Sequence, residues 1–214
     1  MVKSGFVLHS RLMNPTLTPE AAQWTAVLLQ ERRSTLPKRL MGPGPDAAQR
    51  QAILQAAASA PDHDQILPWR LVQVPQTLRP ALGLAFESAL LARDPLADDQ
   101  ARAQAREKAL RSPWLLLLVV RTAGEPGDIP AAERLLSAGS AVQNMLLMAT
   151  AFGLGSSLTS GKALQSPELR SFFGLHANEE ALCFVNFGHI RSQREARTRP
   201  DVARYVSTLG EPGV

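Results

Sequence analysis

The sequence of 214 residues has one cysteine, 5% aromatic residues and no long apolar run. Because Cys183 stands alone, the chain can form neither an internal disulfide nor a zinc site built on several thiolates. The longest apolar run, residues 114–120, is far shorter than the roughly 20 residues that cross a bilayer. No basic stretch followed by a long apolar segment opens the chain, which argues against a secretory signal. These absences predict a soluble, cytoplasmic protein of a reducing compartment, with no membrane association.

Basic residues exceed acidic ones by 23 to 19, which gives a formal net charge of +4. A basic protein can bind nucleic acid, but such surfaces interleave cations with aromatic side chains, and Tyr205 is the only tyrosine. The densest group of arginines lies near the C-terminus, at Arg191, Arg194, Arg197 and Arg199. A small anionic ligand such as a phosphate explains clustered arginines equally well, so nucleic acid is not the expected partner.

The rest of the composition, 45% hydrophobic and 20% charged, is that of an ordinary globular protein with enough chain for a sizeable core. Residues 1–17 show no periodicity, which predicts an extended or poorly ordered N-terminal arm. Residues 18–214 are predicted to form a single domain, because no linker or internal repeat interrupts them.

Cap residues and one-sided apolar spacing predict helices that outnumber the strands, and hence an α+β fold. The helices are expected at residues 18–33, 46–60, 77–92, 99–110, 131–152 and 166–173. Strands are expected at residues 71–74, 114–121 and 182–187, the second of them apolar enough to be buried on both faces. Residues 153–162, rich in glycine and serine, are expected to form a turn and loop after the longest helix.

Two arginines and a serine, Arg32, Arg33 and Ser34, close the first expected helix. Forked cationic donors beside a neutral hydroxyl donor suit a phosphate group. Arginines also complement the negative C-terminal end of a helix dipole. Taken alone, this motif leaves both interpretations open.

A polar loop, residues 59–69, follows the second expected helix and has a proline near each end. His63 stands between two aspartates, so it could act as an acid or base with a carboxylate partner. A metal site has little support, because none of the other three histidines lies at ligand spacing from His63. The alternative is a surface loop whose Trp69 fills the core.

Two further segments could contact a ligand. Residues 153–162 are small and flanked by glycines, which would let the backbone approach a planar ligand, although a plain helix end explains them too. They do not form a Walker phosphate loop, because Ser160 stands where that motif requires its second glycine. Residues 188–199 carry the C-terminal arginines, which a solvated tail would also explain. No nucleophile elbow supports hydrolase chemistry.

In this order the segments resemble the FMN-dependent nitroreductase family, and most closely its small bacterial NAD(P)H nitroreductase type. The resemblance covers about residues 20–207 and depends on Arg32-Arg33-Ser34, Ala60-Pro61-Asp62-His63, Pro68-Trp69 and the glycine- and serine-rich segment. It implies a central, mostly antiparallel sheet sandwiched by helices, in an intertwined homodimer with FMN at the interface.

The resemblance also implies the site. It assigns the phosphate and ribityl chain of FMN to Arg32 and Ser34 with Arg33 beside them, and the phosphate also to Arg197 or Arg199. It places Leu158, Thr159 and Ser160 against the isoalloxazine ring, and has the partner subunit's Ser59 and the partner subunit's His63 line the flavin. Hydride would pass from NAD(P)H to N5 of FMN and then to a nitroaromatic, quinone or similar acceptor, in a ping-pong cycle through one site. No catalytic side chain and no metal are implied.

Two segments depart from the family pattern. Leu36 stands where many members have a lysine near the flavin pyrimidine, although Lys38 and Arg39 follow closely. Gln65 and Leu67 stand where many members have asparagine and glutamine, and Leu67 cannot hydrogen-bond the flavin edge. These departures motivate an alternative, an FMN-binding protein without efficient NAD(P)H turnover. A basic nucleic-acid-binding module is a third hypothesis, which predicts binding with a steep salt dependence.

Overall fold

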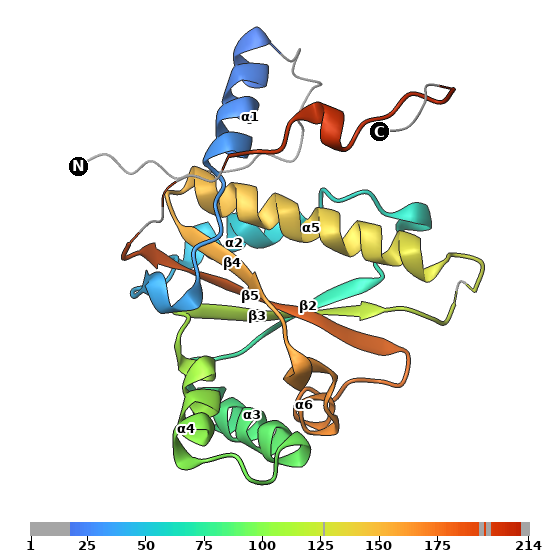
Figure 1. Cartoon of the computed structure of the whole chain (residues 1–214). Helices are drawn as coiled ribbons and strands as arrows, with labels where there is room; N and C mark the ends of the chain where they lie inside the picture. Colours follow the sequence, from blue (N-terminus) through green and yellow to red (C-terminus); the bar gives the residue numbers. More distant parts are fainter. Residues whose placement is uncertain (1–17, 126, 193–194, 196–197, 211–214) are drawn as a thin grey trace.

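The computed structural model describes residues 18–125, 127–192, 195 and 198–210, so the expected N-terminal arm and Arg197 lie outside the described residues. Its centre is a five-stranded antiparallel sheet with helices on both faces, which confirms the expected α+β fold (Figure 1). The strands are β1 (Leu40–Met41), β2 (Trp69–Gln73), β3 (Trp114–Arg121), β4 (Gly155–Thr159) and β5 (Glu179–Ile190).

Within the described residues, six α-helices cover the sheet: α1 (Pro19–Glu31), α2 (Ala47–Ala57), α3 (Arg79–Arg93), α4 (Asp99–Glu107), α5 (Ala131–Ala151) and α6 (Pro167–Phe172). In Figure 1, α1, α2 and α5 lie on one side of the sheet, and α3, α4 and α6 lie on the other. Short 3-10 turns join them: η1 (Pro37–Arg39), η2 (His63–Gln65), η3 (Gln76–Leu78), η4 (Lys108–Leu110), η5 (Lys162–Gln165) and η6 (Val202–Arg204).

Strand β5 organises the sheet, because it pairs with β1, β3 and β4, whereas β2 pairs only with β3. Its ladder with β3 sets Trp114 opposite Phe187, and its ladder with β4 sets Gly155 opposite Gly188. All four ladders are antiparallel.

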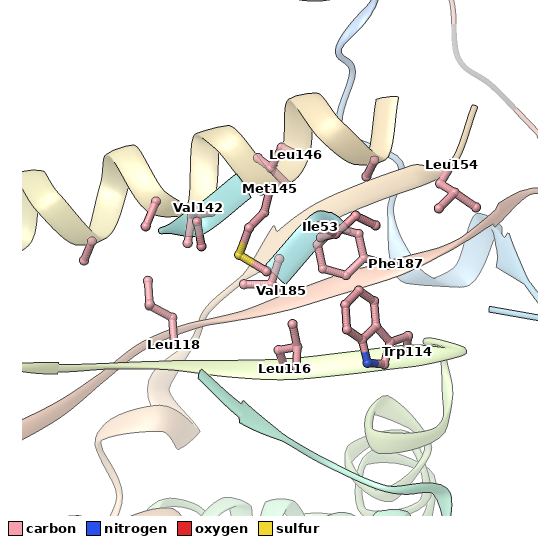
Figure 2. Packing of buried hydrophobic residues seen from close by; sticks show 14 of the residues in the cluster. Ile53, Trp114, Leu116, Leu118, Val142, Met145, Leu146, Leu154, Val185 and Phe187 are labelled. Atoms are coloured by element: carbon pink, nitrogen blue, oxygen red, sulfur yellow. The ribbon is translucent and has the colours of Figure 1, made fainter. Parts of the chain in front are cut away.

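The alternation of side chains along β3 divides the core into two layers. Leu116, Leu118 and Val120 pack with α2 and α5, whereas Leu115, Leu117 and Val119 pack with α3, η4 and α6. Figure 2 shows the first layer, with Leu116 and Leu118 below Met145 of α5. Successive strand residues point to opposite faces, so a continuous apolar run fits a strand that is buried on both. The expected strand at residues 114–121 is therefore confirmed.

Local capping fixes several helix starts where the sequence predicts them. Asp46 accepts a hydrogen bond from the backbone of Gln49, and the Gln49 side chain accepts one from the backbone of Asp46, a reciprocal capping box. Asp98 and Ser166 cap α4 and α6 by a single hydrogen bond each: their side chains accept from the backbone N–H of Ala101 and of Leu169.

The expected loop at residues 153–162 is wrong in its middle, because Gly155–Thr159 form β4. Two serines, a leucine and a threonine give weak strand periodicity, and the ladder with β5 decides the conformation. The short strand β1 is also absent from the sequence-based expectation. Within the described ranges, no helix is both long and apolar enough to cross a membrane.

Candidate functional site

The segment after α1 lies alongside β4. Ser34 forms a parallel bridge with Ser156, and the Thr35 backbone N–H donates to the Ser156 carbonyl at 2.8 Å. The structure therefore brings the expected phosphate-binding segment next to the strand that carries Leu158 and Thr159. Two groups of candidate residues that are far apart in the sequence meet in one region of the fold.

Gly155 makes this close approach possible. A Cβ built on Gly155 would lie 2.7 Å from Leu40 Cδ2, 2.9 Å from Ile190 Cγ1 and 3.1 Å from Thr35 Cβ. All three distances are below ordinary carbon–carbon contact, so only glycine lets Thr35 and the segment around it pack onto β4. The sequence suggested that residues 153–162 allow close approach, but the neighbour here is the chain itself.

Arg199, from the C-terminal segment, forms hydrogen bonds with the C-terminal end of α1. Its Nη2 donates to the carbonyl oxygens of Leu29, Gln30 and Arg32 at 3.5, 3.4 and 3.0 Å. These are carbonyls of the last helical turn, which lack partners within the helix. Arg199 therefore both completes the helix terminus and brings a second positive charge to Arg32.

Burial, and then the charge of Arg199, lower the pKa of the half-buried Arg32 guanidinium. Among the described residues no carboxylate pairs with Arg32, whereas Arg33 lies 3.6 Å from Glu31 Oε2. Arg32 and Arg199 thus form a cationic pair without a counter-ion from the described chain, a place suited to a dianion such as phosphate. The exposed Ser34 hydroxyl adds a neutral donor nearby.

A cleft of about 540 Å³ adjoins this segment. Leu36, Lys38, Thr159 and Ser160 line it from one side, and residues of α3, α4 and η4 line it from the other. The cleft therefore contains two of the three residues that were expected against a flavin ring. Its further cations, Arg93, Lys108, Arg111 and Lys162, were not singled out from the sequence, because they are scattered over 70 positions of the chain.

Ser59 and His63 lie elsewhere. His63 Nδ1 lies 2.6 Å from Glu133 Oε2 in the first turn of α5, whereas Gly155 follows the end of that helix. Twenty-one residues of α-helix span about 30 Å, so the described chain does not bring His63 to Arg32. The hydrogen bond with Glu133, and then the charge of Asp64, raise the pKa of His63.

The loop around His63 has an unusual backbone. Asp64, Gln65 and Leu67 have φ values of 53°, 55° and 43°, a left-handed region that non-glycine residues rarely adopt. Asp62 Oδ2 accepts a hydrogen bond from the Leu67 N–H at 2.7 Å, and Arg121 donates to the Ile66 and Leu67 carbonyls. The Leu67 side chain is exposed and carries no donor, and its backbone N–H is already bonded to Asp62.

Apolar side chains on α1 are left uncovered. None of its side chains is buried in the described part of the chain, and Trp24 is 69% exposed. Leu136 on α5, which borders an open surface beside Ser59, is 71% exposed. Exposed apolar surface of this extent usually marks a binding face.

Comparisons with known proteins find a matching family model, sequence relatives and solved structures of the same fold. A family model described as "Nitroreductase family" matches residues 29–189. A curated relative from Escherichia coli K12, "Putative NAD(P)H nitroreductase YdjA", is 34% identical over 161 residues, which cover 75% of this chain and 85% of that protein.

Solved structures share the fold. A nitroreductase-like family protein from Bacillus cereus has a TM-score of 0.72 at 19% identity, covering 87% of this chain and 96% of that one. A nitroreductase from Bacteroides fragilis with bound FMN has a TM-score of 0.65 at 20% identity, covering 86% and 97%. An NADPH:FMN oxidoreductase from Vibrio harveyi in complex with NAD⁺ has a TM-score of 0.67 at 17% identity, covering 89% and 79%.

Proposed function

The chain belongs to the nitroreductase family, and from this premise we propose that it is an FMN-dependent oxidoreductase that transfers electrons from NAD(P)H to a nitroaromatic, quinone or similar acceptor. Its relatives named NAD(P)H nitroreductases and its structural neighbours with bound FMN or NAD⁺ support this function. We also propose a cytoplasmic location, where NAD(P)H is available as the reductant.

The cationic pair of Arg32 and Arg199 is the observation that carries the FMN assignment. Two guanidinium groups without a carboxylate partner among the described residues match a phosphate dianion in charge and offer the N–H donors that its oxygens accept. Ser34 would donate to the same phosphate or to the ribityl chain, and Arg33 would contribute less because Glu31 already neutralises it. When bound, FMN supplies reversible hydride transfer, which no protein side chain offers.

The residues of β4 would orient the ring. Leu158 is half exposed at the surface of the strand, and Thr159 and Ser160 line the adjoining cleft. Leu36 lines the same cleft, so the cation that many relatives have at this position must come from elsewhere. Lys38, which also lines the cleft, is a direct substitute for it.

We propose a homodimer as the functional unit. The uncovered Trp24 on α1 and Leu136 on α5 support a second copy as the partner, because α1 has little of its own to pack against. His63 lies about one helix length from Arg32 within the chain, so it can reach the flavin only from a second subunit. In this arrangement the partner subunit's Ser59 and the partner subunit's His63 complete each site.

We propose that reductant and acceptor use one cleft in turn. Its volume of about 540 Å³ is typical for a small-molecule site and suits one planar ligand at a time. Parallel initial-rate lines with both substrates varied would support this ping-pong order, whereas intersecting lines would count against it.

The visible spectrum of the purified protein tests the function directly. We expect flavin bands that bleach when NADPH or NADH is added without oxygen. Bands that neither nucleotide bleaches would favour the FMN-binding protein without turnover. No flavin bands, even after incubation with FMN, would contradict the proposed function.

Sedimentation velocity tests the homodimer. Trp24→Glu places a charge on the uncovered apolar face, so we expect a monomer that loses FMN on dilution. Leu96→Glu is the matched control, because Leu96 is 94% exposed but lies between α3 and α4. A wild-type monomer that holds FMN would overturn the dimer.

A further inference from the structure

The cleft beside β4 combines an apolar floor with a cationic rim. Phe86 and Leu90 of α3, Leu115 of β3 and Phe184 of β5 form the floor, the last two of them buried. Phe86 and Phe184 meet edge to face, with ring centroids 5.6 Å apart. Such a floor favours a flat, apolar ligand.

Five cationic side chains line the rim: Lys38, Arg93, Lys108, Arg111 and Lys162. No aspartate or glutamate is among the described residues that line the cleft. The three lysines have no ion-pair partner in the described part of the chain, and the buried Nε of Arg111 has no hydrogen-bond partner there.

The nearby acids are already engaged. Glu107 pairs with Arg111 at 3.2 Å, outside the lining of the cleft. Glu87 pairs with both Arg102 and Arg106 between α3 and α4. The rim therefore keeps a positive potential, and this potential is concentrated in a concave site with apolar walls.

We infer that the acceptor is an aromatic acid, with a planar apolar body on the floor and a carboxylate or similar acidic group at the rim. This inference rests on the proposed function and specifies the substrate class of the same site. Lys38 is the rim cation that lies toward the flavin in the proposed function, whereas Arg93, Lys108, Arg111 and Lys162 are separate from it and from Arg32 and Arg199, which were assigned to the phosphate of FMN. A neutral aromatic ligand would pack against the apolar floor but form no ion pair with the rim, and a cationic ligand would be repelled by the rim.

The reaction with a nitro acid balances with the reductant already proposed. ArNO₂ + NAD(P)H + H⁺ gives ArNO + NAD(P)⁺ + H₂O: one N–O bond breaks, the nitro group gains two electrons, and the oxygen leaves as water. No histidine, aspartate, glutamate, cysteine or tyrosine is among the described lining residues, so the additional proton comes from solvent, directly or through one of the three lysines that line the cleft.

The test compares 4-nitrobenzoate with its neutral amide, 4-nitrobenzamide, and with a 4-nitrobenzyl trimethylammonium salt. We expect kcat/KM to be about tenfold or more higher for the acid than for the amide, and lowest for the cation. Intrinsic reactivity works against this order, because the carboxylate withdraws electrons less than the amide. The preference should shrink as the salt concentration rises.

Variants identify the rim as the cause. Lys108→Gln and Arg93→Gln should each lower the acid-to-amide ratio about threefold or more, and Lys108→Arg should keep it. Arg204→Gln, on η6 outside the cleft, removes the same charge and should also keep the ratio. The ratio is internal to each preparation, so partial misfolding does not imitate the effect.

A ratio near one in the wild type would overturn the inference, as would Gln variants that raise KM for NADPH and leave the ratio unchanged. The latter result would assign the cations to the phosphates of the reductant. Bleaching by NADPH and reduction of the neutral quinone menadione are measured on the same preparation. If both reactions occur and the acid-to-amide ratio is near one, the inferred substrate class is wrong and the proposed function stands. If neither reaction occurs, the proposed function itself is wrong.

Discussion

Arg199 donates to the carbonyl oxygen of Arg32 at 3.0 Å although the two residues are 167 positions apart in the chain. The contact joins the end of the first helix to the C-terminal segment. It gives the site two charges whose mutual repulsion a bound phosphate would relieve.

Neutralising either arginine should weaken FMN binding. We expect Arg32→Gln or Arg199→Gln to raise the Kd for FMN about 10- to 150-fold, the range for one charge-assisted hydrogen bond. Fluorescence quenching of FMN on binding measures this. Arg33→Gln is the matched comparison, and its effect should be smaller because Arg33 pairs with Glu31. An equal loss from Arg33→Gln would contradict the proposed geometry.

A methyl group at Gly155 should displace the Arg32–Ser34 segment. Gly155→Ala brings a Cβ to 2.7 Å from Leu40 and 3.1 Å from Thr35, so we expect about 1–3 kcal/mol of destabilisation and weaker FMN binding. Urea unfolding and FMN titration measure the two effects. Gly127→Ala is the control, because its Cβ would meet nothing within 4 Å. Unchanged behaviour of Gly155→Ala would show that the segment is not held against β4.

The pair of His63 and Glu133 should make stability depend on pH. Glu133 raises the pKa of His63 in the folded state, so this stabilisation is present below the ordinary value of 6.5 and is lost as pH rises through the raised value. Glu133→Gln should lower the pKa of His63, followed by NMR, toward 6.5 and reduce that pH dependence, with Asp64 still raising the pKa. An unchanged titration curve in Glu133→Gln would disprove the pairing.

Glu179 should govern stability in acid. Arg70 donates to both of its carboxylate oxygens, at 2.7 and 2.9 Å, and holds the pKa of Glu179 at about 2. This stabilisation is present above the ordinary value of 4.5 and disappears as pH falls toward 2. Arg70→Gln should cost about 2–3 kcal/mol near neutral pH and flatten the acid limb of the stability curve. Glu107→Gln, in an exposed pair, should cost under about 0.5 kcal/mol.

The single thiol should be inert while the protein is folded. Burial raises the pKa of Cys183 to about 11, so almost no thiolate is present at neutral pH. We expect negligible reaction with a disulfide reagent in buffer and complete reaction in urea. Rapid modification of the folded protein would mean that β5 opens locally.

The sequence predicts the elements whose own pattern is strong. The apolar run at residues 114–121 and the 3.6-residue spacing in residues 131–152 correspond to β3 and α5 almost residue for residue. Strand β4 was expected as a loop, because its conformation depends on a ladder with β5 rather than on its own alternation.

Some residues of the candidate site could be predicted from the sequence, and others are found only in the folded structure. Resemblance to a family supplied Arg32, Ser34 and Arg199, and the structure shows Arg32 and Arg199 in contact. No local signal in the sequence marks the cations around the cleft, because Lys38, Lys108 and Lys162 come from three separate segments. Only the tertiary fold brings them together. The positioning role of Gly155 was hidden too, since a glycine after a helix is common for other reasons.

The pairing of β5 has a consequence for how the protein is made. Three of the four ladders in the sheet need this strand, and it is the last strand to be synthesised. Until β5 begins to emerge from the ribosome, β2 and β3 are the only described strands that can form their ladder, and the apolar edge of β3 that faces β5 has no partner. The nascent chain therefore carries an open strand edge from the completion of β3 at Arg121 until β5, Glu179–Ile190, has been synthesised, and in this period aggregation or chaperone binding competes with folding.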